Sequence, residues 1–153
     1  MQRCDDVRVL AWRALARAHA VLGAALDAAL EERSGVPLLT YDVLSSLAEA
    51  DGQRLRMQQV AERMPLTPSG LTRLIDRMEE AGLVRRQVCS SDRRGTYAVL
   101  TPAGRRTLRR AGEVHVRILE ERLVARLSAH ELMCLRAACT KIAGLVEDQP
   151  TND

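Results

Sequence analysis

The sequence predicts a mainly α-helical fold with a single small β-hairpin. Phe is absent and aromatic residues make up only 2% of the 153 residues, so the core has to be built from Leu, Val, Ala, Ile and Met. Ala, Leu and Arg favour helices, whereas the aromatic residues that favour strands are scarce. Apolar residues recur at helical spacing in most segments, and only two short stretches have the composition of strands. An apolar share of 46% is typical of one compact soluble domain.

The first predicted element is one long helix from Asp6 to Glu32, and the Gly- and Pro-containing segment 34–37 ends it. Its polar side chains form a narrow stripe, and apolar side chains fill most of the remaining circumference. A helix that is apolar nearly all round is buried on more than one side. In so small a protein, we expect another subunit to supply the second burying surface.

Two shorter helices are predicted next. The first starts at about Thr40 and stops at the Asp-Gly pair of residues 51–52. The second covers Leu55 to Met64. Pro65 interrupts it, because Pro lacks the amide donor and its ring clashes with the preceding turn.

A third helix follows after a short connection. Thr67 is placed as its N-cap and Pro68 at its first helical position, which together form a strong start signal. Gly82 is placed as the left-handed residue that closes the helix. The apolar residues of this helix recur at positions i, i+3, i+4 and i+7 and are Leu71, Leu74, Ile75 and Met78.

The predicted hairpin consists of Val84–Val88 and Thr96–Leu100, joined by a polar, basic loop with a Gly at its far end. The Thr-Pro pair of residues 101–102 then caps a helix that is expected to run to about Leu127. A final helix follows residues 128–131, Ser-Ala-His-Glu, which have the form of a capping box.

Positive charge is concentrated in the middle of the chain. Between Gly52 and Arg110 there are thirteen Arg against five acidic residues, a net charge of +8 in a chain whose total is +3. The two ends are therefore acidic overall, and Lys141 is the only lysine. A basic centre between acidic flanks is typical of a protein that binds a polyanion, and Arg makes planar bidentate contacts with phosphate and guanine. We therefore expect nucleic acid as a partner.

Not every charged or aromatic residue of this centre is expected to contact nucleic acid. Asp76 and Arg77 are candidates for internal ion pairs that fix their helix. Tyr97 is expected to be a packing residue. The basic residues expected on a solvated helix face are Arg105, Arg106, Arg109 and Arg110.

The order of helix, short break with Pro, capped helix and hairpin is that of a winged helix-turn-helix. In this arrangement, the first turn of the second helix offers small polar side chains and unpaired amides to base edges and phosphate. An Arg at the tip of the hairpin reaches a minor groove. The sequence thus predicts a protein that binds double-stranded DNA through this arrangement.

Residues 71–86 resemble the recognition helix and first wing strand of the MarR family of bacterial transcription regulators. Residues 92–95, Asp-Arg-Arg-Gly, and the Leu-Thr pair and glycine within 100–104 resemble that family's wing and its exit into the next helix. The resemblance covers about residues 40–104 closely. It implies a mostly α-helical homodimer whose first helix and last two helices interlock.

The resemblance also implies a role for each matching position. The recognition helix would lie in a major groove, and Arg94 would enter the minor groove, with Asp92 holding the wing through an ion pair to a neighbouring Arg. Arg56 and Arg93 would contact phosphates, although Arg56 stands where members often have a Ser or Thr helix cap. The further DNA-binding positions implied are Thr67, Pro68, Ser69, Thr72, Arg73 and Arg77.

On this plan, residues 6–36 form an N-terminal dimerisation helix, 38–101 a winged helix-turn-helix lobe and 102–148 the C-terminal dimerisation helices. We expect a homodimeric repressor of a palindromic operator, in the cytoplasm and associated with the nucleoid. No apolar run is seen to approach the roughly 18–20 residues that cross a bilayer, and residues 1–6 lack the order of a secretion signal, so no membrane partner is expected.

Members of the family are usually switched by a small anionic or phenolic ligand bound between the dimerisation helices and the winged lobe. The residues that could line such a cleft here are Trp12, His19, Tyr41 and Asp42. Ordinary packing and polar contacts are the alternative explanation for these four residues.

Two other functions stay open. A subset of the family senses peroxides through a cysteine of the first helix, for which Cys4 is the candidate, although Asp5 and Asp6 beside it oppose thiolate formation. A winged helix used only for protein assembly is the other. The sequence has no phosphate-binding glycine loop or nucleophile elbow, and its four cysteines form no CxxC pair. We therefore expect no enzyme, metal or cofactor.

Overall fold

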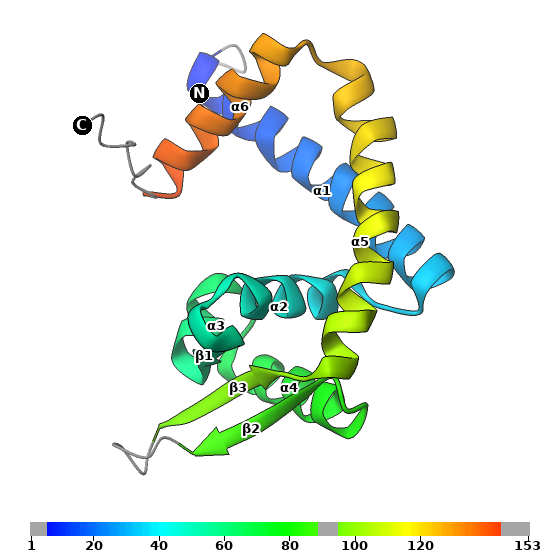
Figure 1. Ribbon diagram of the computed structural model, residues 1–153. Helices are drawn as coiled ribbons and strands as arrows, with labels where there is room; N and C mark the ends of the chain where they lie inside the picture. Colours follow the sequence, from blue (N-terminus) through cyan, green and yellow to red (C-terminus); the bar gives the residue numbers. More distant parts are fainter. Residues whose placement is uncertain (1–5, 89–94, 145–153) are drawn as a thin grey trace, which may run out of the picture.

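The long helices α1, α5 and α6 form the upper part of the molecule, and a lobe of shorter helices and three strands forms the lower part (Figure 1). α5 runs from the lobe into the upper part, where it crosses α1 (Figure 1). The computed structural model describes residues 6–88 and 95–144. The elements in chain order are α1 (Val7–Ser34), α2 (Leu38–Glu49), the 3₁₀ turn η1 (Asp51–Gln53), β1 (Arg54–Arg56), α3 (Met57–Arg63), α4 (Pro68–Glu80), β2 (Val84–Val88), β3 (Thr96–Leu100), α5 (Pro102–Arg122), the 3₁₀ turn η2 (Val124–Arg126) and α6 (Ala129–Ile142).

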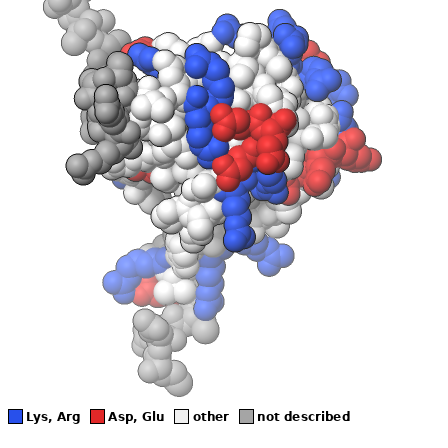
Figure 2. Space-filling model, turned by 90° about the horizontal axis from the view of Figure 1, so that it is seen from below, with Lys and Arg blue, Asp and Glu red and all other residues white. Residues whose placement is uncertain are grey.

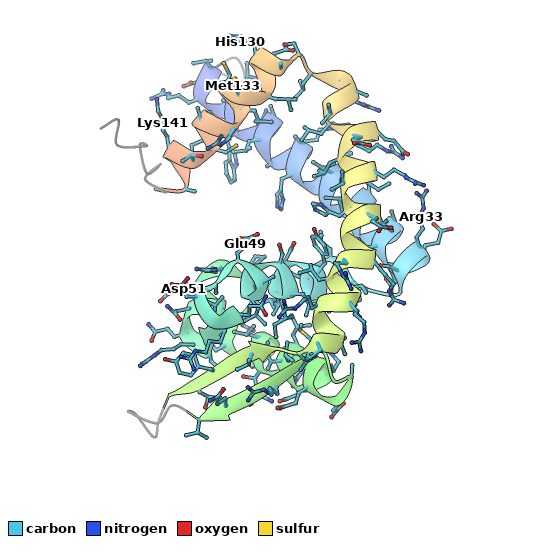
Figure 3. The ribbon with its side chains drawn as sticks, in the orientation of Figure 1. Arg33, Glu49, Asp51, His130, Met133 and Lys141 are labelled. Atoms are coloured by element: carbon cyan, nitrogen blue, oxygen red, sulfur yellow. The ribbon has the colours of Figure 1, made fainter. Side chains whose placement is uncertain are left out.

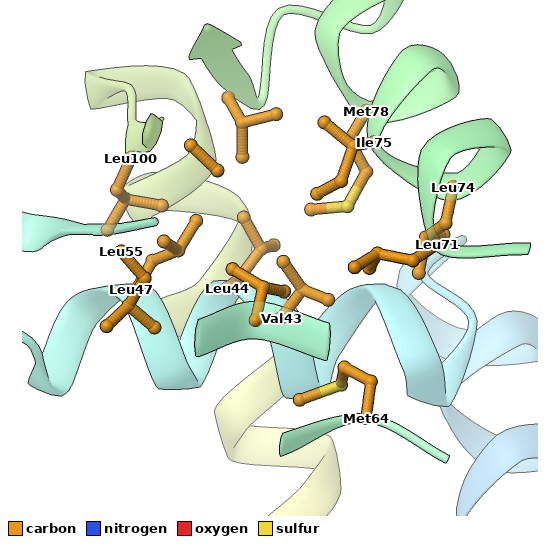
Figure 4. Close-up of a cluster of buried hydrophobic side chains, with 13 residues drawn as sticks. Val43, Leu44, Leu47, Leu55, Met64, Leu71, Leu74, Ile75, Met78 and Leu100 are labelled. Atoms are coloured by element: carbon orange, nitrogen blue, oxygen red, sulfur yellow. The ribbon is translucent and has the colours of Figure 1, made fainter. Parts of the chain in front are cut away.

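One apolar core holds the lobe together, and every helix and strand of the lobe contributes to it (Figure 4). Leu44 and Leu47 of α2 are fully buried in it, as is Ile75 of α4. Burying each such side chain stabilises the fold by about 1.5–3 kcal/mol. The four apolar residues predicted for the inner face of α4 are all buried, so the orientation of this helix is fixed from within the lobe.

The sheet has the strand order β1-β3-β2 with antiparallel pairing throughout. The two predicted strands are confirmed, but the prediction that a helix begins at Leu55 is wrong, because residues 54–56 form β1 and α3 begins at Met57. Leu55 is buried between two exposed Arg and pairs with Ala98, while the backbone of Arg56 is still extended at φ −63° and ψ 146°. A strand of three residues shows too little alternation to be separated from the helix that follows it.

Both predicted ends of α4 are confirmed. The Thr67 hydroxyl accepts a hydrogen bond from the amide of Gly70 at 3.2 Å, and Pro68 is the first helical residue. At the other end Gly82 has φ +69°, a conformation that suits a residue without Cβ. The amide of Leu83 then donates to the carbonyl of Met78 at 2.8 Å, which closes the helix.

Three other helix ends differ from the prediction. α2 begins two residues earlier than expected, at Leu38, whose amide donates to the Asp27 carboxylate of α1 at 2.8 Å. α1 continues to Ser34, where the left-handed Gly35 closes it. α5 ends at Arg122 rather than near Leu127, because the chain tightens there into η2.

α1 is apolar but mostly uncovered in the single chain. Its buried residues are Leu26, Ala29 and Leu30, whereas Trp12 is 68% exposed. By length and composition alone, α1 would be long and apolar enough to cross a bilayer, which corrects the expectation that no segment is. This is a weak indication, since the core helix of a soluble protein meets the same criterion.

The first turn of α5 packs directly on the turn between α4 and β2. The backbone amide of Thr101 donates to the carbonyl of Leu83 at 3.1 Å, and the Thr101 hydroxyl donates to the same carbonyl at 3.0 Å. A Cβ at Gly104 would lie 2.1 Å from this oxygen and 2.9 Å from Leu100 Cδ1. Only glycine allows the helix and the turn to approach so closely.

Replacing Gly104 with Ala should therefore lower the free energy of unfolding by about 1–3 kcal/mol, since the helix has to move off the turn. The measurement is urea-induced unfolding followed by circular dichroism. Gly112→Ala in the same helix is the matched control, because its Cβ would lie 4.0 Å from the Tyr41 hydroxyl. That variant should be as stable as the wild type or gain up to about 1 kcal/mol. Equal stability of Gly104→Ala and wild type would contradict the tight contact.

Candidate nucleic-acid interface

The outer face of α4 carries the residues predicted to contact DNA. All six positions named at its start and along its length are exposed: Thr67, Pro68, Ser69, Thr72, Arg73 and Arg77. Behind them, Leu71, Leu74, Ile75 and Met78 hold the helix against the core. Arg73 and Arg77 also line a shallow hollow of about 590 Å³ with Asp76. The helix therefore presents one polar face with two guanidinium groups to its surroundings.

Hydroxyl groups at the start of α4 are partly engaged within the helix. The Thr72 hydroxyl donates to the carbonyl of Pro68 at 2.9 Å, and the hydroxyls of Thr67 and Ser69 lie 3.3 Å apart. Thr67 also accepts from the amide of Gly70 as the cap. Of these side chains, Ser69 and the methyl group of Thr72 are the parts least committed to holding the helix.

Arg56 is the N-cap residue of α3, the first helix of the helix-turn-helix. Its side chain cannot accept a hydrogen bond, so Gln59 takes over this role: its amide oxygen accepts from the Arg56 backbone amide at 2.8 Å. The hydrogen bond to Gln59 thus helps to close the start of α3 where a Ser or Thr cap is missing. The Arg56 side chain takes no part in the cap and extends over the sheet. Its guanidinium carbon lies 5.7 Å from the centre of the Tyr97 ring.

The wing consists of β2 and β3, which pair from Val84 and Leu100 to Val88 and Thr96. Both strands project from the lobe (Figure 1). Asp92, Arg93 and Arg94 lie outside the described residues, so the predicted roles of the wing tip stay predictions.

Arg86 joins the recognition helix to the wing. Its guanidinium donates to Asp76 Oδ1 and to Glu79 Oε2, both at 2.7 Å, and its backbone amide donates to Glu79 Oε1 at 2.7 Å. The hydrogen bonds from the Arg86 backbone and side chain lower the pKa of Glu79 below its ordinary value. Asp76 therefore makes an internal ion pair, as the sequence predicts, and its partner is Arg86 on the wing.

Arg86 belongs to the basic centre of the chain, but the motifs in the sequence predict no individual role for it. The alternation of the strand was the signal that could have found it, because Arg86 pairs with buried Ala98 and so faces α4. Arg85 pairs with Val99 and points the other way. Seen from below, basic side chains cover several parts of the molecule, with a compact acidic group between them (Figure 2). The positive charge that is concentrated in the middle of the chain is thus separated by acidic side chains on the surface of the folded protein.

The four candidate ligand residues fall in two separate places. Trp12 and His19 line a hollow of about 430 Å³ between α1 and α6, together with Cys139 and Ile142. Tyr41 and Asp42 lie on α2, where the Tyr41 ring stacks on His115 of α5 with a centroid distance of 4.5 Å. Figure 3 shows Met133 and Lys141 on α6, far from the lobe. Within one chain, the four residues do not form one cleft.

Tyr41, Asp42 and His115 form a half-buried titratable cluster at the junction of lobe and long helices. Burial raises the pKa of Asp42, and the nearby His115 partly opposes that shift. Burial lowers the pKa of His115, which Asp42 partly opposes. The pKa of the Tyr41 phenol is raised, mainly by burial and further by Asp42. The sequence does not indicate His115 as part of this cluster, since only the fold brings it beside Tyr41 of α2.

The redox candidate Cys4 lies outside the described residues. On α6, the exposed Cys134 has its sulfur 3.5 Å from His130 Nε2, and Cys139 is partly covered. Within residues 6–88 and 95–144, His, Cys, Asp and Glu side chains form no group of three or more that could hold a metal ion.

A helix-turn-helix whose second helix exposes hydroxyls and guanidiniums, followed by a paired hairpin, defines a winged-helix DNA-binding protein. The model of the MarR family matches residues 34–95. The HTH-type transcriptional repressor Rv2887 of Mycobacterium tuberculosis is 34% identical over 115 residues, which are 75% of this chain and 80% of that protein. The chain belongs to the MarR family, and it is a DNA-binding transcriptional regulator rather than an enzyme.

Solved structures support the same assignment. Sco3205 of Streptomyces coelicolor, a MarR family regulator in complex with DNA, is 34% identical with a TM-score of 0.81, covering 92% of this chain and 88% of its own. CouR of Rhodococcus jostii RHA1, bound to p-coumaroyl-CoA, is 28% identical with a TM-score of 0.75, covering 97% of this chain and 96% of its own.

Replacing Arg86 with Gln should destabilise the protein by about 1 kcal/mol, because Asp76 and Glu79 lose a charged hydrogen-bond donor. The neighbouring Arg85→Gln removes the same charge from the outer face and should leave stability unchanged. Since the pKa of Glu79 is lowered in the folded protein, this contribution is present above about pH 4.5 and is lost as the pH falls further. Urea unfolding of both variants at pH 7 and pH 3.5 measures it, and equal losses in the two variants at pH 7 would refute the role of Arg86.

His115 gives the folded protein a stability loss on mild acidification. Its pKa is lowered from 6.5, so the unfolded chain takes up a proton first and is favoured as the pH falls below about 6.5. Asp42 has the opposite effect on stability. Its pKa is raised, so the folded protein takes up a proton before the unfolded chain does and is favoured as the pH falls toward the ordinary pKa of 3.8. Thermal melts of wild type and His115→Gln at pH 7 and pH 5 should show a smaller loss of Tm in the variant. An identical loss would exclude His115 as the source.

Proposed function

We propose that the protein is a homodimeric repressor that binds a palindromic operator with α4 and the wing of each subunit. The observation that carries this proposal is the outward polar face of α4, held by a fully apolar inner face. The DNA complex of Sco3205, whose chain is similar over most of its length, supports DNA as the partner.

Dimerisation is supported by apolar surface that a single chain leaves uncovered on the long helices. None of the residues of α6, all of which the structure describes, is buried. Met133 and Ile142 are each 72% exposed, and the hollow beside Trp12 is lined almost entirely by apolar side chains. A second copy that inserts its own α1 and α6 would cover these surfaces, since large apolar side chains that stay exposed together favour aggregation. The large apolar residues exposed on the long helices and η2 are Val7, Leu10, Trp12, Val21, Val116, Val124, Met133, Leu135 and Ile142.

In the proposed complex, each α4 enters a major groove and the two half-sites lie about 34–36 Å apart. Arg73 and Arg77 contact base edges or phosphates beside Thr67, Ser69 and Thr72. Pro68 fixes the start of the helix close to the DNA. Arg94 enters the minor groove from a wing that Asp92 orients, and Arg56 and Arg93 bind phosphates.

A small anionic or phenolic effector is proposed to release the DNA. The junction where α2 meets α5 offers the Tyr41 phenol, the Asp42 carboxylate and the His115 imidazole in one place. CouR, which is bound to p-coumaroyl-CoA, makes a phenolic acid derivative a reasonable first compound to test. Trp12 and His19 of a partner subunit are proposed to complete the site. We place the regulator in the cytoplasm, at the nucleoid.

The test begins with duplexes selected by the purified protein from its own fragmented genome. Arg73→Ala and Arg94→Ala should each weaken binding to the selected duplex by about 1–3 kcal/mol, because each removes a groove or phosphate contact. Arg110→Gln on α5 is the control and should bind like the wild type. Sedimentation should show a dimer in all four proteins. A monomer in solution, or unchanged affinity of both variants in anisotropy titrations, would overturn the proposal.

A further inference from the structure

The lobe and its long helix α5 meet α1 in two places (Figure 1). The first is the crossing of α1 and α5, where Leu26 and Ala29 pack against Ile118. The second is the start of α2, which follows α1 after the short link 35–37. Two helices that cross contact each other over a short length, so the crossing alone leaves α5 and the lobe some freedom to pivot on α1. The contact at the start of α2 lies to one side of this pivot and therefore sets the angle.

The side of α1 that faces the start of α2 is loosely packed. A hollow of about 340 Å³ lies there, and the residues that line it include Gly23 of α1 and Leu38 and Leu39 of α2. A Cβ at Gly23 would meet no side chain of the described residues within 4 Å. Apolar packing therefore does not hold the two helices together on this side.

A hydrogen bond crosses this gap. The Asp27 carboxylate of α1 accepts from the backbone amide of Leu38 at 2.8 Å. Leu38 is the first residue of α2, and the side chain of the preceding Pro37 makes no cap hydrogen bond. A carboxylate suits this position, because the bond is charge-assisted and the N-terminus of a helix carries a partial positive charge. Asp27 thus supplies, from another helix, the cap that the link itself lacks.

The angle between α1 and the lobe matters because of the two-fold symmetry of the proposed dimer. A turn of the lobe on α1 occurs in both subunits and changes the distance between the two α4 helices. Neighbouring base pairs of duplex DNA are only about 3.4 Å apart along the axis. A given lobe angle therefore fits one spacing of the two half-sites.

We infer that Asp27 is a positioning residue: its bond to the Leu38 amide holds the lobe at one angle on α1 and so restricts the dimer to operators of one half-site spacing. This inference rests on the proposed function as a homodimer on a palindromic operator. Asp27 needs no contact with a base or phosphate for this role, since it lies on α1 and acts through the start of α2.

The test compares three duplexes that carry the selected operator with its half-sites at the original spacing, one base pair closer together or one base pair further apart. Wild type should bind each altered duplex at least about tenfold more weakly, because its two α4 helices no longer reach their bases together. In Asp27→Ala this penalty should fall to about threefold, while binding to the original duplex weakens by about two- to threefold, because the lobes now sample several angles. The ratio of affinities is the decisive measurement, since a protein that is merely destabilised loses affinity for all three duplexes alike.

Matched variants separate this role from a general effect of charge. Glu31→Ala removes an exposed carboxylate one turn further along α1 and should keep the wild-type penalty. Asp27→Asn retains an acceptor oxygen and should keep most of it. Asp27→Ser has a side chain one bond too short to reach the amide, and it should repeat the loss if Asp27→Ala fails to fold.

The inference is overturned if wild type binds all three duplexes equally, or if Asp27→Ala keeps the full penalty for altered spacing. A loss of the penalty in Glu31→Ala as large as that in Asp27→Ala overturns it as well. Failure of wild type to bind the original duplex overturns the proposed function instead.

Discussion

The apolar core that α2, α4 and the sheet share is the constraint on which the rest of the protein depends. Ile75 and Met78 point into it from α4, and Leu44 and Leu47 meet them from α2. Because this face is fully buried, the helix cannot roll about its own axis without exposing large side chains to water. The polar face is therefore presented at a fixed angle by the packing of this small lobe.

Around this core, electrostatic contacts set the relation between recognition helix and wing. Arg86 binds α4 through Asp76 and Glu79, while the neighbouring Arg85 points to the other side of the sheet and is exposed. Period-two alternation thus turns the two arginines of β2 to opposite faces of the sheet, Arg86 toward α4 and Arg85 away from it. Net charge along the chain does not reveal this division, because each charge counts equally whichever way it faces.

The sequence predicts those features whose signals are local. Thr67 with Pro68, and Gly82 with the following Leu, mark the ends of α4 because caps depend on neighbouring residues alone. β1 was missed because its three residues become a strand only by pairing with β3, which follows some forty residues later. His115 and Arg86 escaped notice for the same reason. Their partners come from other elements: strand alternation indicates the side to which Arg86 points, but the spacing in the chain does not identify the residues that it meets there.

The close packing of Gly104 on the Leu83 carbonyl gives α5 a mechanical role. This helix has 21 residues, so it forms a stiff arm of about 30 Å that is anchored at one end to the turn just after α4. Because Gly104 has no Cβ, α5 and the turn pack too closely to slide past each other. A movement of the far end of α5 is therefore transmitted to the turn after α4. A tilt of about 5° over such a length displaces one end by roughly 3 Å, which exceeds the tolerance of a hydrogen bond to a base edge.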